Sequence, residues 1–158
     1  MTAHPARPPR ALPGHDRRVG RLRIDRITGP PGVLRDDDGA VLAARCHRAG
    51  RWPSRLVGLL ATPDLAPDEA LWIAPCAGVH AVGLRAPISC AFLDAAGRVL
   101  RVVDPLPRGR AASVRGARAV VECRAGVLGA VRPGARLYLC PPPPKSPLRA
   151  DNLSPPRG

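Results

Sequence analysis

Cysteine and histidine side chains provide the most reactive groups in this sequence, and their spacing raises two chemical possibilities. Cys76 and His80 lie four residues apart, and an imidazolium lowers the pKa of a nearby thiol and makes it nucleophilic. Cys46 is followed directly by His47, and both residue types are zinc ligands. Adjacent strand residues point to opposite faces, however, and the chain has no Cys-x-x-Cys pair. We therefore expect no metal site and no cofactor, and a small enzyme using Cys76 with His80 stays as an alternative.

Arginines form a second candidate site. The formal net charge is +13, and a charge of this sign favours nucleic acid or another anionic partner. The densest basic stretch runs over residues 98–124 and contains Arg98, Arg101, Arg108, Arg110, Arg115, Arg118 and Arg124. Sequence-tolerant single-strand binders also stack bases on aromatic side chains, and none of the aromatic residues lies among these arginines. Nucleic-acid binding is therefore a second alternative.

The cysteine count and the apolar runs indicate the compartment. No stretch approaches the roughly 20 apolar residues of a membrane span. The first residues lack the apolar run of a secretory signal peptide. Five cysteines are an odd number, which suits free thiols in a reducing compartment. We expect a cytoplasmic protein without a membrane span.

Proline divides the chain into three parts. Residues 1–32 and 141–158 are rich in proline and poor in apolar side chains, so we expect both to be disordered tails. Pro141 to Pro144 favour a polyproline-II rod and end any strand before them. The remaining segment, 33–140, is expected to form one domain.

Turn signals in this segment predict two β-hairpins. Asp36 to Gly39 and Asp94 to Gly97 each lie between short apolar runs. Asp accepts backbone N–H bonds at the start of such a turn, and Gly adopts the positive φ that closes it. Further strands are expected at 71–74, 79–84, 118–123 and 135–140. Around the second turn, strand alternation places Ile88, Cys90 and Phe92 on one face, and Val99, Arg101 and Val103 on one face of the returning strand.

Two short helices are also expected. Ser54 can cap a helix over 55–61, and a second covers 125–131, before Pro133. Short strands at close spacing with one or two short helices are typical of a small sandwich or barrel. The predicted fold class is therefore mainly β.

Several motifs in register resemble domain-of-unknown-function family 192, a prokaryotic group. They are Arg55 to Leu60, Cys76 to His80, Gly83 to Ile88, Phe92 to Leu100, and Ala117 to Gly126 followed by Pro133-Gly134. The resemblance covers about residues 40–140. It implies a mainly β, sandwich- or barrel-like fold, and it implies no reaction. The family pattern has Asp where this chain has Ser89, so a carboxylate-dependent activity at that position would be lost here.

The family motifs cluster around His80, Arg85 and Ser89, while reactive residue types are sparse. We therefore expect a non-catalytic binding or accessory module that presents these three residues to a protein or a small anionic ligand. Within this surface, Arg85 is the candidate contact for an anion, and a surface salt bridge is the alternative use of its side chain.

Overall fold

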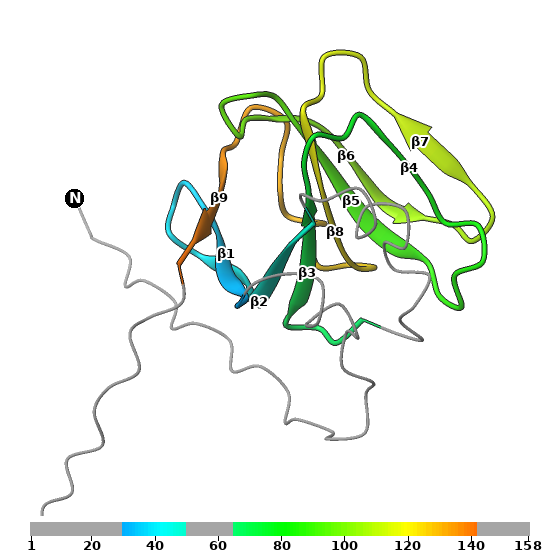
Figure 1. Cartoon of the computed structure of the whole chain (residues 1–158), viewed down its shortest axis with the longest axis horizontal. Coiled ribbons are helices and arrows are strands. Elements are labelled where there is room, and N and C mark those ends of the chain that lie inside the picture. Colours follow the sequence, from blue (N-terminus) through cyan, green and yellow to red (C-terminus); the bar gives the residue numbers. More distant parts are fainter. Residues whose placement is uncertain (1–29, 50–64, 142–158) are drawn as a thin grey trace, which may run out of the picture.

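The computed structural model describes residues 30–49 and 65–141, and this part of the chain is built from strands and turns (Figure 1). The strands are β1 (Gly32–Asp36), β2 (Val41–Ala49), β3 (Glu69–Ile73), β4 (Gly78–His80), β5 (Ile88–Leu93), β6 (Val99–Leu106), β7 (Ala111–Ser113), β8 (Ala119–Arg124) and β9 (Leu137–Cys140). The predicted mainly β class is confirmed. The expected tails and the helix over 55–61 lie outside the described residues, apart from residues 30–32 and 141.

Seven strands form one mixed sheet in the order β6-β5-β8-β3-β2-β1-β9. All neighbours are antiparallel except β2 and β3, which run parallel. The two ends of this order meet, because Val99 N donates to Ala135 O at 2.8 Å and Gly134 N donates to Val99 O at 2.8 Å. The sheet therefore curls until the start of β6 contacts the segment before β9. The remaining strands, β4 and β7, form a separate two-stranded sheet.

Both predicted hairpins are confirmed. β1 and β2 flank Asp36 to Gly39, and β5 and β6 flank Asp94 to Gly97. In the second turn, Asp94 Oδ1 accepts N–H bonds from Ala96 at 2.8 Å and Arg98 at 2.9 Å, and the Arg98 bond is the main cause that lowers the pKa of this carboxyl. Gly97 adopts a φ of 78°, and a Cβ on it would lie 2.8 Å from Leu137 O. Glycine therefore permits both the turn and the contact that closes the sheet.

The expected helix over 125–131 is wrong, because this segment forms consecutive turns. Val127 N donates to Arg124 O at 3.2 Å, and Val131 N donates to Leu128 O at 3.0 Å. Gly126 has a φ of 90°, which interrupts a right-handed helix within its first turn. The turns instead place Leu128 and Val131 over the concave side of the sheet.

Two apolar clusters lie on the two sides of the large sheet. The inner cluster lies between the sheet and residues 125–137, and it includes Leu34, Leu93, Val121, Leu128 and Leu137. Four alanines also belong to it, at positions 43, 70, 91 and 119, and their small side chains leave room for the sheet to curl. The outer cluster lies between the sheet and β4 with β7, and Figure 1 shows these two strands as a layer beside β5 and β6. Residues 125–137 therefore cover one side of the large sheet, and β4 with β7 cover the other side.

The expected shared face of Val99, Arg101 and Val103 is wrong, whereas Ile88, Cys90 and Phe92 do share the outer cluster. Phe92 pairs with Arg101 but Leu93 pairs with Val99, so Leu100 is an extra residue in β6. Such a bulge reverses the side to which the following residues point. Val99 therefore lies in the inner cluster, and Val103 packs against the outer one.

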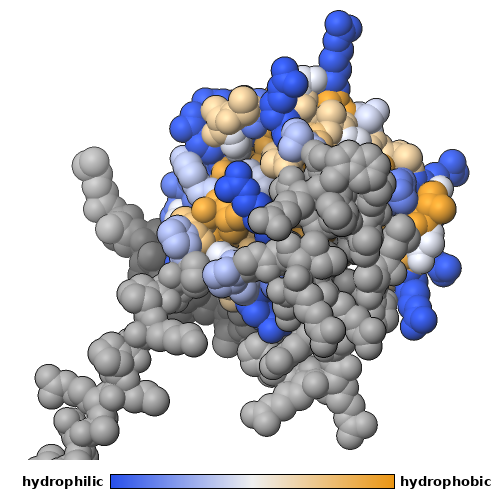
Figure 2. Space-filling model, in the orientation of Figure 1, coloured by the Kyte–Doolittle hydropathy of each residue, from blue (hydrophilic) through white to orange (hydrophobic). Residues whose placement is uncertain are grey.

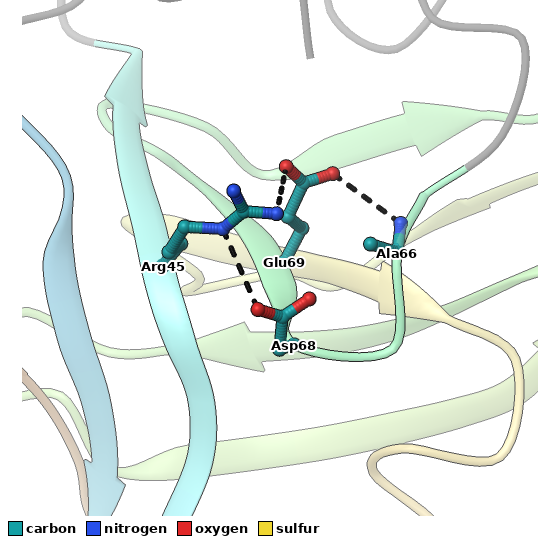
Figure 3. Close-up of polar contacts among 4 residues, drawn as sticks. All are labelled: Arg45, Ala66, Asp68 and Glu69. Carbon is teal, nitrogen blue, oxygen red and sulfur yellow. Dashed lines mark hydrogen bonds and ion pairs between the residues drawn. The ribbon is translucent and has the colours of Figure 1, made fainter. Parts of the chain in front are cut away.

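A polar cluster joins β2 to the start of β3 (Figure 3). Arg45 Nη2 lies 2.7 Å from Glu69 Oε1, and Arg45 Nε lies 3.5 Å from Asp68 Oδ2. Ala66 N donates to the other oxygen of Glu69 at 3.3 Å. Glu69 is only 2% exposed, so its charge depends on these partners.

Candidate functional site

The loops at one end of β4 and β7 are joined to each other by three hydrogen bonds. Ala81 N donates to Arg110 O at 2.7 Å, and Gly109 N donates to Ala81 O at 2.9 Å. Arg108 Nε donates to Leu84 O at 3.0 Å. Figure 1 shows the two loops side by side at the edge of the molecule. They therefore form one surface from segments that are far apart in the sequence.

This surface carries positive charge around one aliphatic side chain. We call it the basic corner, and it consists of the exposed residues His80, Val82, Arg85, Arg108 and Arg110. Val82 is 54% exposed. In the orientation of Figure 1, Figure 2 shows hydrophobic atoms bordered by strongly hydrophilic ones at this edge. The contacts thus unite two predicted binding residues, His80 and Arg85, with two arginines of the predicted basic patch.

In the part of the chain that the structure describes, no ion pair involves an arginine of the basic corner. Neither residues 80–87 nor residues 105–113 contain Asp or Glu. Within the described ranges, both ion pairs are made by Arg45, on the distant strand β2. Guanidinium groups present a planar fork of donors that fits carboxylate and phosphate oxygens. The acid-free sequence of the two loops thus leaves the guanidinium groups of the corner suited to anionic groups.

The other arginines of the predicted patch lie elsewhere. Arg115 and Arg118 are at the opposite end of β7, where Cys76 N donates to Arg118 O at 3.0 Å. Arg98 directly precedes β6, and its guanidinium donates a hydrogen bond to Gly134 O at 3.0 Å. Arg101 follows on β6 and is exposed. The contiguous arginine-rich sequence is therefore divided among three places in the fold.

Cys76 and His80 lie on either side of Val79, which packs into the outer cluster. The Cys76 thiol donates to Gly78 O at 3.1 Å, and the thiol packs against the outer cluster. His80 is exposed at the end of β4. Cys76 therefore lies at the edge of the outer cluster, whereas His80 faces solvent at the start of the following loop.

Ser89 lies inside the fold, at 0% exposure on β5. Its Oγ accepts the Gly126 N–H at 3.0 Å, and Asp104 Oδ1 accepts the same N–H at 2.8 Å. The serine therefore holds the 125–131 turns against the sheet and does not join His80 and Arg85 on the surface. An aspartate at this position, as in the family pattern, would place a second carboxyl beside Asp104.

Replacing Ser89 with alanine is expected to lower the free energy of unfolding by about 1 kcal/mol. The substitution removes the hydrogen bond from Gly126 N to Ser89 Oγ, whereas the bond from Gly126 N to Asp104 Oδ1 remains. Urea denaturation followed by fluorescence measures this change. Ser113→Ala, at an exposed position of β7, is the control and is expected to change stability by less than about 0.5 kcal/mol. Equal effects of the two substitutions would contradict the role of Ser89.

None of the five cysteines forms a disulfide, and three of them are buried core residues. Burial raises the pKa of the Cys46 thiol to about 12, and it also raises the pKa values of the Cys90 and Cys123 thiols. Thiols with raised pKa values are poor nucleophiles and poor ligands. Residues 30–49 and 65–141 contain no group of three or more Cys, His, Asp or Glu side chains that could hold a metal ion. The same residues contain no helix of the length and hydrophobicity needed to cross a bilayer.

Glu122 is a buried carboxyl that the sequence analysis missed. It lies on β8 between Leu71 of β3 and Cys90 of β5, on the side of the outer cluster, and is 5% exposed. Loss of hydration raises the pKa of this carboxyl from 4.5 to about 7. The signal in the sequence was an acidic residue within an apolar strand, Val120-Val121-Glu122-Cys123. Val82 was missed because exposure cannot be read from a single valine.

Two solved structures share this fold. One, from Sinorhizobium meliloti 1021, is described as a "putative transcription regulator"; it is 19% identical, covers 70% of this chain and 92% of its own, and has a TM-score of 0.60. The other, a protein of unknown function from Novosphingobium aromaticivorans DSM 12444, is 18% identical, covers 75% of this chain and 99% of its own, and has a TM-score of 0.59. At these identities the likeness establishes the fold alone. No curated protein matches the chain.

The predicted family resemblance is confirmed. The family model DUF192, "Uncharacterized ACR", matches residues 33–139, a range that begins in β1 and ends in β9. The match includes the basic corner, the Ser89 contact and Glu122. This chain therefore belongs to the DUF192 family, domain-of-unknown-function family 192.

Proposed function

We propose that this chain is a non-catalytic binding module that recognises an anionic group on a partner through the basic corner. The observation that carries the proposal is the convergence of Arg85, Arg108 and Arg110 on two loops that contain no acidic residue. Because hydrogen bonds already fix the loops, the corner loses little conformational entropy on binding. The burial of Cys46, Cys90 and Cys123 supports a binding role over thiol catalysis.

The proposal predicts that binding depends on where the arginines are and not on total charge. The double variant Arg85→Ala/Arg110→Ala is expected to bind a fluorescently labelled oligoglutamate about tenfold more weakly than the unmodified chain, because two charge-assisted contacts are lost. Fluorescence anisotropy at near-physiological salt measures the affinity. Arg108 is left in place, since its Nε bond to Leu84 O helps to hold the loops.

The matched control is Arg48→Ala/Arg132→Ala, which removes the same charge from exposed positions on β2 and in the 132–135 turn. It is expected to change the affinity by less than about twofold, since exposed distant charges are screened by salt. An equal loss in both double variants would mean that the oligoglutamate responds to net charge only, and it would refute the basic corner as a site.

Nucleic-acid binding through the same arginines is the second candidate, and one solved structure of this fold is described as a "putative transcription regulator". Its specific support here is the excess of arginine over acidic residues around β6 and β7. An oligothymidine used in the same titration decides between the candidates.

A further inference from the structure

The basic corner contains an exposed aliphatic side chain, Val82, among its positive charges, so a matching partner should offer both anionic and apolar groups. Resting on the proposed function, we infer that the corner binds an acidic segment of another protein in which an aliphatic residue lies among carboxylates. Val82 is 54% exposed and follows Ala81, whose backbone joins the two loops. Burying a valine against an aliphatic side chain is favourable, whereas a chain of carboxylates alone would leave it in water.

Among the described residues, the basic corner contains no Phe, Tyr or Trp, and His80 is its one aromatic ring for a base to stack on. Within the described residues, Phe92 is fully buried and Tyr138 is 42% exposed on β9, at the other edge of the large sheet. Trp72 lies on β3 and packs against the inner cluster. Unpaired bases gain affinity mainly by stacking on exposed aromatic rings, and valine offers no such face. The surface therefore fits carboxylates and aliphatic groups better than bases.

The shape of the surface is fixed before a partner arrives. Gly83 and Gly109, with φ values of 82° and 74°, shape the two loops, and both residues are exposed. The bonds from Gly109 N to Ala81 O and from Arg108 Nε to Leu84 O hold the loops at a constant separation. An extended acidic segment can therefore place carboxylates on Arg85 and Arg110 while its aliphatic residue packs on Val82.

The test compares three labelled probes of equal charge in fluorescence anisotropy: the peptide Glu-Glu-Leu-Glu-Glu, the peptide Glu-Glu-Ala-Glu-Glu and an oligothymidine. The leucine peptide is expected to bind about fivefold more tightly than the alanine peptide. Val82→Ala is expected to reduce this preference to less than about twofold, because the leucine then has no valine to pack against. Val41→Ala, at a 51% exposed valine of β2, is the control and is expected to preserve the preference.

The outcomes separate this inference from the proposed function. Two results would refute the acidic-aliphatic partner: equal binding of the two peptides, or tighter binding of the oligothymidine than of the leucine peptide. If binding in either case still requires Arg85 and Arg110, the anionic site itself remains supported. If no probe depends on these two arginines, then the basic corner itself is refuted. Circular dichroism of each variant confirms that its fold is retained.

Discussion

Replacing Glu122 with glutamine is expected to raise the free energy of unfolding at pH 8 by about 3 kcal/mol. The pKa of this carboxyl rises from 4.5 to about 7 on folding because burial removes its hydration. Between these values the folded state binds more protons than the unfolded state, so stability falls as pH rises from about 4.5 to about 7. Above that range the wild type carries the full cost of a buried charge, which the neutral amide avoids.

Urea denaturation at a series of pH values measures this effect. The two proteins are expected to have similar stability near pH 4, where Glu122 is protonated in both states, and to diverge as pH rises. Asp38→Asn, at an exposed position in the first hairpin turn, is the control and is expected to change stability by less than about 0.5 kcal/mol. If the free energies of unfolding of the wild type and of Glu122→Gln change in parallel with pH, then folding does not shift the pKa of Glu122.

Replacing Arg45 with leucine is expected to lower the free energy of unfolding by about 3 kcal/mol, because it leaves the buried Glu69 carboxylate without its cation. Arg45 also lies 3.5 Å from Asp68, so the substitution removes both ion pairs at the start of β3. The arginine side chain itself is 37% exposed, which places the expected loss at the lower end of the range for buried pairs. Thermal and urea denaturation at neutral pH measure the change.

The matched control for Arg45 is Arg48→Leu, an exposed arginine on the same strand, expected to alter stability by less than about 0.5 kcal/mol. The double variant Arg45→Leu/Glu69→Leu is expected to recover part of the loss, because it removes the unpaired charge as well. Equal destabilisation by Arg45→Leu and Arg48→Leu would mean that the Glu69 contact contributes nothing.

Local signals in the sequence predicted the hairpins because each depends on a few adjacent residues. Asp94 accepts bonds from residues two and four positions later, and Gly97 supplies the positive φ. The same kind of reasoning failed at 125–131, where a short helix ending before Pro133 was expected. Gly126 donates its N–H to Ser89 and Asp104, which come from β5 and β6, and these distant partners stabilise turns instead.

The bulge at Leu100 shows why side-chain faces were only partly predictable. The alternation of side chains along a strand predicted the correct face for Ile88, Cys90 and Phe92, because β5 itself contains no extra residue between these positions. It failed across β6, because the extra residue exists only in the pairing of β6 with β5. The isolated sequence of β6 contains no mark of that pairing.

The candidate site was also only partly predictable. His80 and Arg85 were selected from the family motifs, and both are exposed in the basic corner. Ser89 came from the same motifs but faces the interior, because strand alternation after Ile88 turns it away from the outer cluster. Arg108 and Arg110 were predicted only as members of a long basic stretch. Of the arginines in that stretch, the fold brings these two to the loops that also carry Arg85.

The sequence alone determined the mainly β class, the two turn-defined hairpins and the family, because each follows from short-range residue preferences or from motifs in order. Tertiary structure alone decided which charges share a surface and which polar groups are buried. Those properties depend on pairings between residues far apart in the chain, such as Ala81 with Arg110 and Cys90 with Glu122. Burial then changes the chemistry of a side chain, as it does for Glu122, and no local pattern carries that information.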